Sequence, residues 1–99
     1  MGVILKLLLN RKERAMKQKD FETADLYLAS AISILLKSNP NYKVENRRTL
    51  FVFPITDALY KAMNAFNNGI QLNAYEYAQT LKYLRAEMLM RRGQEGGHQ

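Results

Sequence analysis

The spacing of apolar residues divides the chain into helical segments and one strand-forming segment. Between residues 24 and 35, apolar side chains recur at helical intervals and cover more than half of the circumference, which predicts a central helix that is covered from two sides. Thr23 is the expected N-cap of this helix, and Asp25 stabilises its first turn. Pro40 disfavours helical geometry in the residue before it, so the helix should end by residue 39.

A β-hairpin is predicted after the central helix. Residues 42–45 and 48–53 are rich in strand-forming types, and the two residues that begin at Asn46 fit a tight turn with Asn46 in a left-handed conformation. The register with Glu45 opposite Arg48 gives the hairpin a core face. The residues expected on this face are Tyr42, Val44, Phe51 and Phe53.

The other face of the hairpin also carries two apolar residues, Leu50 and Val52. We expect them to be half exposed unless a neighbouring segment covers them. In addition, a two-stranded sheet leaves two unpaired edges. Either a short third strand from residues 70–72 or another chain is therefore expected to protect this part of the molecule.

Two further helices follow the hairpin. The second helix begins at Thr56 and ends before Gly69, and the third begins at Asn73, where Glu76 stands three residues later as a reciprocal capping partner. Arginines followed by Gly93 provide the expected end of the third helix.

These elements predict one small α+β domain in the order helix, hairpin, helix, helix. It should span residues 21–92, after a basic leader helix or arm at residues 1–20 and before a disordered tail at residues 93–99. The predicted core contains Leu28, Ile32, Leu35, Phe51, Phe53, Leu59, Met63, Phe66, Leu81 and Leu84.

Four short motifs lie mostly at packing positions within this domain. They are Asp25-Leu26-Tyr27-Leu28-Ala29, Phe51-Val52-Phe53, Asn68-Gly69, and Tyr77 with Leu81-Lys82-Tyr83-Leu84. In this order the chain resembles a small domain family of unknown function that occurs in bacteria and their phages. The resemblance covers about residues 21–92 and implies the fold without an activity. The chain departs from the family at residues 38–41, where a glycine is expected, and in its longer basic leader.

The chain contains few residues of the types that carry catalysis. It has no cysteine, and its single histidine, His98, lies in a glycine-rich tail. Glu22 and Asp25 are explained by stabilisation of a helix N-terminus, and the glycines lie at helix ends and chain ends instead of in a phosphate-binding loop. We therefore expect no enzymatic activity, no cofactor and no metal site.

The apolar residues 3–9 do not predict a membrane segment. Lys6 interrupts them, and they fall far short of the roughly 20 residues that a spanning helix needs. We expect no association with a membrane. The absence of cysteine fits a reducing environment, so the expected location is the cytoplasm.

The net charge of +6 is concentrated in the leader. Residues 1–20 contribute +4, residues 21–92 contribute only +3, and Glu95 in the tail contributes −1. This pattern predicts a small accessory protein that binds nucleic acid weakly and without sequence specificity through the leader and the hairpin turn. The candidate residues are Arg11, Lys12, Arg14, Lys17, Lys19, Arg47, Arg48, Arg91 and Arg92.

Other residues extend this hypothesis. Lys43, Lys82 and Arg85 can join the same phosphate-binding face, although scattered solvated charges explain them equally well. Tyrosines near basic residues suit either base stacking or the edge of a core, and the core edge is the preferred interpretation. These tyrosines are Tyr42, Tyr60, Tyr75, Tyr77 and Tyr83.

The alternative function is a protein interaction. In this interpretation the domain pairs with itself or with another protein through the exposed hairpin edge, assisted by Leu50 and Val52. A nucleic-acid partner and a protein partner thus both remain open at this point.

Overall fold

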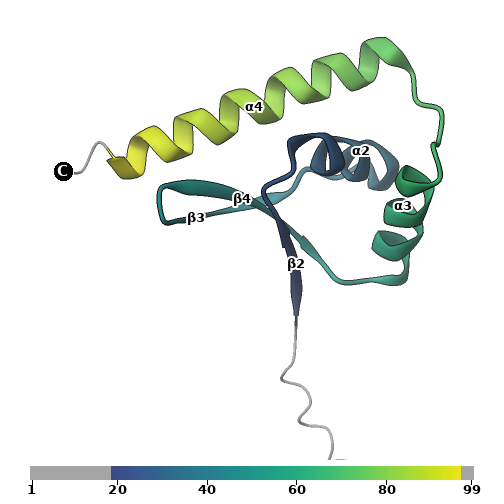
Figure 1. Ribbon diagram of the computed structural model, residues 1–99, viewed down its shortest axis with the longest axis horizontal. Coiled ribbons are helices and arrows are strands. Elements are labelled where there is room, and N and C mark those ends of the chain that lie inside the picture. Colours follow the sequence, from purple (N-terminus) through teal and green to yellow (C-terminus); the bar gives the residue numbers. More distant parts are fainter. Residues whose placement is uncertain (1–18, 97–99) are drawn as a thin grey trace, which may run out of the picture.

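The structure is a computed structural model that describes residues 19–96, with side chains described to residue 93. Within this range it is an α+β domain in which the predicted order of helix, hairpin, helix and helix is confirmed (Figure 1). The elements are β2 (Asp20–Thr23), α2 (Leu26–Leu36), β3 (Asn41–Glu45), β4 (Arg48–Pro54), α3 (Asp57–Asn67) and α4 (Ala74–Gly96).

The hairpin has the predicted register. Glu45 pairs with Arg48 and Tyr42 pairs with Phe51. Asn46 and Arg47 both have positive φ, 54° and 64°, as a type I′ turn requires. Hairpins favour this turn type because its twist matches that of the two strands.

The third strand comes from a different segment than predicted. β2 pairs antiparallel with β4, which gives the sheet the order β2-β4-β3, whereas residues 70–72 form an irregular link before α4. Phe21 and Thr23 lie opposite Phe53 and Phe51 and therefore point to the core face. A strand of four residues has too few alternations to show a clear period, so these residues resembled the start of a helix.

The start of α2 also differs from the expectation. Asp25, not Thr23, is the N-cap, and its carboxylate accepts hydrogen bonds from the backbone N–H groups of Tyr27 and Leu28. The Thr23 hydroxyl instead accepts a hydrogen bond from the backbone N–H of Asp25 at 3.0 Å, which holds the bend between β2 and α2.

The predicted starts of the last two helices are confirmed. Thr56 accepts a hydrogen bond from the backbone N–H of Leu59 at 3.0 Å, and Asn73 accepts one from that of Glu76 at 2.8 Å, which is one half of the predicted reciprocal pair. The end of α4 was predicted too early, because the helix continues through Gly93 to Gly96. A glycine inside a helix is less favourable than an alanine by only about 1 kcal/mol, so Gly93 alone does not end the helix.

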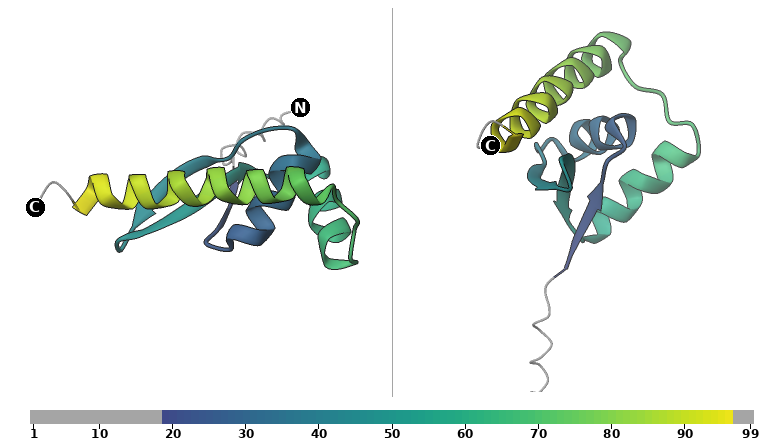
Figure 2. Two further views of the ribbon diagram at one scale, coloured as in Figure 1. Left: turned by 90° about the horizontal axis from the view of Figure 1, so that it is seen from above. Right: turned by 60° about the vertical axis from the view of Figure 1, so that its left-hand side comes forward.

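The core lies between the sheet and the helices. Residues from α2, α3 and α4, among them Ile32, Leu59 and Leu84, cluster with Phe51 and Phe53, so all three helices cover the same face of the sheet. Figure 2 shows the second half of α4 lying along the hairpin. Of the ten predicted core residues, five are buried and five are half-buried. The half-buried residues are Leu28, Leu35, Met63, Phe66 and Leu81.

The opposite face of the sheet is better covered than predicted. Leu50 and Val52 are each only 8% exposed. Both lie on the central strand, where Lys43 pairs in register with Leu50 on one side and Glu22 pairs with Val52 on the other. An ion pair of 3.1 Å between the Lys43 Nζ and a Glu22 carboxylate oxygen bridges this strand. The aliphatic parts of these two side chains therefore contribute to the cover.

Candidate nucleic-acid interface

The hairpin turn and the C-terminal half of α4 lie at the same end of the molecule (Figure 1). Two contacts join them. The Thr49 hydroxyl, fully buried, donates a hydrogen bond to the Met88 carbonyl oxygen at 2.9 Å. The Arg91 guanidinium lies 4.0 Å from the centroid of the Tyr42 ring, at a cation–π distance. These contacts hold the turn arginines near the end of α4.

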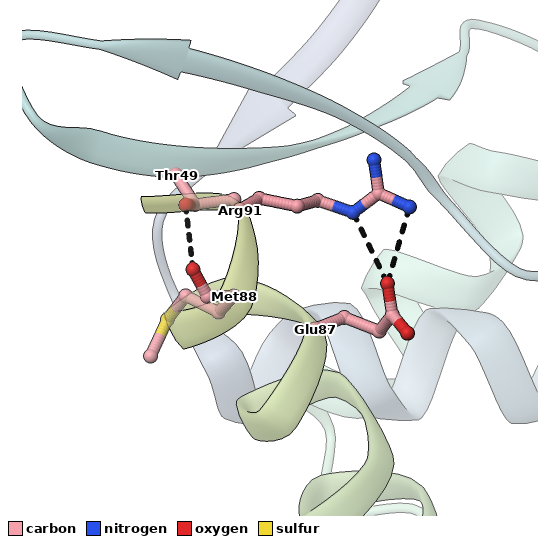
Figure 3. Close-up of polar contacts among 4 residues, drawn as sticks. All are labelled: Thr49, Glu87, Met88 and Arg91. Atoms are coloured by element: carbon pink, nitrogen blue, oxygen red, sulfur yellow. Dashed lines mark hydrogen bonds and ion pairs between the residues drawn. The ribbon is translucent and has the colours of Figure 1, made fainter. Parts of the chain in front are cut away.

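Arg91 is half-exposed and is paired within the domain. Its Nη2 and Nε atoms each lie 3.1 Å from the same Glu87 carboxylate oxygen, one turn earlier on α4 (Figure 3). With its guanidinium also stacked on Tyr42, Arg91 attaches α4 to β3. Of the two arginines predicted here, Arg92 is the exposed one.

Tyr42 lies at the centre of this junction. Its ring meets the Phe51 ring edge to face, with centroids 5.9 Å apart, and its hydroxyl is buried without a hydrogen-bond partner among the described residues. Burial raises the pKa of Tyr42 to about 12, and the neighbouring Tyr83 and the negative charge of Glu87 act in the same direction against the opposing effect of Arg91. The phenol therefore stays neutral at physiological pH.

The exposed cations of α4 lie on one flank of the helix. Lys82, Arg85 and Arg92 are exposed, and at 3.6 residues per turn they fall within an arc of about 80°. Glu76 and Glu87 fall about 160–180° from the centre of that arc. We call Lys82, Arg85 and Arg92 the basic stripe. A separation of this kind gives one side of the helix a positive field.

Five of the nine predicted basic residues lie within the described part of the chain. Arg11, Lys12, Arg14 and Lys17 lie outside the described residues. Lys19 is exposed, and its carbonyl oxygen accepts a hydrogen bond of 3.4 Å from the Ile55 backbone N–H, at the start of the sheet. The remaining ones are Arg47 and Arg48, both exposed at the hairpin turn, and Arg91 and Arg92 on α4.

The basic stripe was only partly identified from the sequence. Lys82 and Arg85 are additional members of the predicted phosphate-binding face, outside the nine candidates. The signal that identifies them is their spacing of three and seven residues along one helix, which places them with Arg92 on one flank. Lys43, by contrast, is held by Glu22. Its hydrogen bond to Glu22 raises the pKa of Lys43, and the Glu22 charge adds to this.

A groove of about 490 Å³ lies between the end of α2 and the first half of α4. Most of the residues that line it have polar side chains, and within it the Ser33 hydroxyl donates a long hydrogen bond of 3.5 Å to the Asn39 side-chain oxygen. The lining has one carboxylate, Glu76, and one ammonium group, Lys37. It contains neither cysteine nor histidine, so it offers no thiolate nucleophile and no imidazole base.

Comparisons with known proteins supply no relative for this chain: no protein-family model, curated protein or solved structure matches it. The resemblance to a bacterial and phage domain family therefore stays a prediction. Within residues 19–96, no helix has the length and apolar character needed to cross a membrane. The same part of the chain contains no cluster of three potential metal-ligating side chains.

Proposed function

We propose that this protein is a small, non-enzymatic, cytoplasmic accessory protein that binds nucleic acid through its phosphates, without sequence specificity. The observation that carries the proposal is the arrangement of charge on α4, where Lys82, Arg85 and Arg92 share one flank and the carboxylates of Glu76 and Glu87 lie on the other. Phosphate contacts of this kind position a protein on nucleic acid without reading its bases.

The hairpin turn supports the same proposal. Arg47 and Arg48 extend the positive charge from the end of α4 to the turn. Arg47 occupies a left-handed position, φ 64°, where glycine is the preferred residue of a type I′ turn. A residue that opposes local backbone preference is often one whose side chain has a function. We assign Arg47 to phosphate binding on these grounds.

The leader carries further basic residues, Arg11, Lys12, Arg14 and Lys17. It joins β2 at Asp20, which pairs with Pro54 at the end of β4 away from the hairpin turn. In the proposed mode, α4 and the hairpin turn form the ordered part of the interface and the leader contributes further phosphate contacts.

The test is a salt titration of binding to duplex DNA with matched charge variants of the full chain. Each neutralised phosphate contributes about −0.9 to the slope of log affinity against log salt. Arg85→Gln combined with Arg92→Gln should therefore flatten the slope by about 1.8. The control, Lys37→Gln combined with Lys61→Gln, removes the same charge from exposed positions on α2 and α3 and should leave the slope unchanged.

Two results would overturn the proposal. One is the absence of binding by the unchanged protein at about 50 mM salt, where phosphate contacts are strong. The other is an equal change in slope for both double variants, because this would mean that net charge acts without a localised interface.

The alternative is self-association or a protein interaction through the hairpin edge. It is favoured by the position of β3 at one edge of the sheet, where no further strand pairs with it among the described residues. Lys43 in the middle of this short strand weakens the edge as a template, and Leu50 and Val52 are covered. Sedimentation at high protein concentration tests the self-association, which requires a dimer or larger species.

A further inference from the structure

The groove between the end of α2 and the first half of α4 takes no part in the phosphate-binding function. Its α4 wall is formed by Glu76, Gln79, Thr80 and Tyr83. At 3.6 residues per turn these four positions fall within an arc of about 100°. The centre of this arc lies about 150° around the helix from the centre of the basic stripe, so the two surfaces are on opposite flanks of α4.

The other wall of the groove is the turn that ends α2, and backbone hydrogen bonds fix its shape. Lys37 has a left-handed conformation, φ 54°, and its backbone N–H donates to the carbonyl oxygen three residues earlier at 3.2 Å. The Ser38 N–H donates to the Ser33 carbonyl oxygen at 3.1 Å, which completes a Schellman motif. Asn39 follows directly, and the buried Pro40 after it restricts the Asn39 backbone to extended conformations. The Asn39 side chain is therefore presented to the groove by a fixed loop.

The polar side chains of the groove have unused hydrogen-bonding capacity. Between the lining residues, the one side-chain hydrogen bond in the described part of the chain joins the Ser33 hydroxyl to the Asn39 oxygen, and its length of 3.5 Å makes it weak. Within residues 19–93, neither the Asn39 nor the Gln79 side-chain NH₂ group donates to another residue. The groove thus carries an available amide on each of its two walls.

We propose that this groove binds an extended, uncharged segment of a partner protein, with the amides of Asn39 and Gln79 pairing with its main chain. A peptide unit presents an N–H donor and a C=O acceptor, and an amide side chain presents the matching acceptor and donors. Amides on both walls hold the segment from two sides. From Glu76 to Tyr83 the α4 wall is about 10 Å long at 1.5 Å per residue, which equals about three residues of extended chain.

The charge and the openness of the groove favour this ligand. The lining has one ammonium group, Lys37, and one carboxylate, Glu76, so its net charge is zero. A nucleic-acid strand would bring phosphates next to the Glu76 carboxylate, and such like-charge contacts are unfavourable. Sites for small molecules enclose about 70–90% of their ligand, whereas this groove is open to solvent and suits a chain that continues beyond it.

NMR spectra of the isotope-labelled full chain test the proposal. The probe is an acetylated and amidated tetrapeptide of alternating alanine and serine, which has a main chain but no charge and no large side chain. At concentrations up to about 10 mM, which reveal weak complexes, it should shift the side-chain NH₂ signals of Asn39 and Gln79 to saturation. Backbone signals of the hairpin turn should not move. The control probe has the same sequence with every backbone nitrogen methylated, and it should not bind because it has no N–H donors.

Matched variants test the role of the amides. Gln79→Ala removes both hydrogen bonds of this side chain and should weaken binding of the tetrapeptide about fivefold or more. Asn39→Ala, on the other wall, should have a similar effect. The control, Gln71→Ala, removes an exposed glutamine from the link before α4, outside the groove, and should leave affinity unchanged. Because Gln79 and Gln71 are both exposed, their variants should melt like the unchanged protein.

The outcomes separate this inference from the nucleic-acid function. Saturable shifts at both amides that are lost with the methylated probe and weakened by Gln79→Ala support it. It is overturned if the tetrapeptide causes no shift at about 10 mM, if the methylated probe binds equally well, or if Gln79→Ala binds as tightly as Gln71→Ala. Tighter binding of maltotriose, an uncharged sugar, would also overturn it and assign the groove to a saccharide. In every case Gln79→Ala should bind duplex DNA with unchanged affinity, because the groove and the basic stripe share no residue.

Discussion

The hairpin turn permits a test in which stability and binding change in opposite directions. Arg47→Gly introduces an Asn-Gly pair, the preferred sequence of a type I′ turn. An L-residue in the left-handed region costs about 1–2 kcal/mol, and glycine at the same position costs about 0.5–1 kcal/mol in chain entropy. Since Arg47 has φ 64° and is exposed, its replacement should raise the free energy of unfolding by about 0.5–1 kcal/mol.

Thermal unfolding followed by circular dichroism measures this change. For a domain of this size, 1 kcal/mol corresponds to a shift in Tm of roughly 4–8 °C. The matched control is Arg48→Gly, which removes the same charge from a regular strand position in β4 and should lower stability. Both variants should weaken nucleic-acid binding. If Arg47→Gly destabilises the protein as much as Arg48→Gly does, the argument from turn geometry is wrong.

Three further predictions concern the core and the helix ends. Tyr42→Phe removes a buried hydroxyl that has no partner and should raise stability by about 1 kcal/mol, as measured by urea unfolding. The pKa of Tyr42 is about 12 in the folded protein and about 10 in an unfolded chain. Its contribution to the free energy of unfolding is therefore present below pH 10 and is lost between about pH 10 and pH 12. The phenylalanine variant should lose less stability over this alkaline range. Asn73→Ala should cost about 1 kcal/mol through loss of the cap of α4, and an unchanged melting curve would contradict the cap. Leu84→Ala, at a fully buried position, should cost about 2–5 kcal/mol, and a loss below 1 kcal/mol would mean that the core closes around the cavity.

The elements with strong local signals were predicted correctly from the sequence. The hairpin register follows from alternation and a two-residue turn, and the starts of α3 and α4 follow from side chains that bond the first backbone N–H groups. β2 was missed because its pairing with β4 is set by tertiary contact, and four residues cannot display a period. Its partner strand lies beyond the whole of α2, so no local rule connects them.

The basic residues of the candidate interface could be predicted from the sequence, whereas their contacts could not. Charge counting identified the arginines of the turn and of the last helix, and helical spacing alone groups Lys82 and Arg85 with Arg92. The engagement of Arg91 was not predictable, because it depends on Tyr42, which a hairpin far away in the sequence brings to within 4.0 Å. The cover over Leu50 and Val52 likewise depends on Glu22, which belongs to the unforeseen strand.

The position of β2 also determines how the sheet opens. Glu45 and Arg48 of the hairpin are joined by two residues, whereas Phe21 of β2 pairs with Phe53, 32 residues later. Loop closure over that distance costs more entropy, and β2 is a short strand at the sheet edge with no partner on its outer side among the described residues. Its backbone amides should therefore exchange hydrogen with solvent faster than those of β4. The leader is connected directly to this least protected strand, so opening of β2 would lengthen the tether between the leader and the rest of the domain.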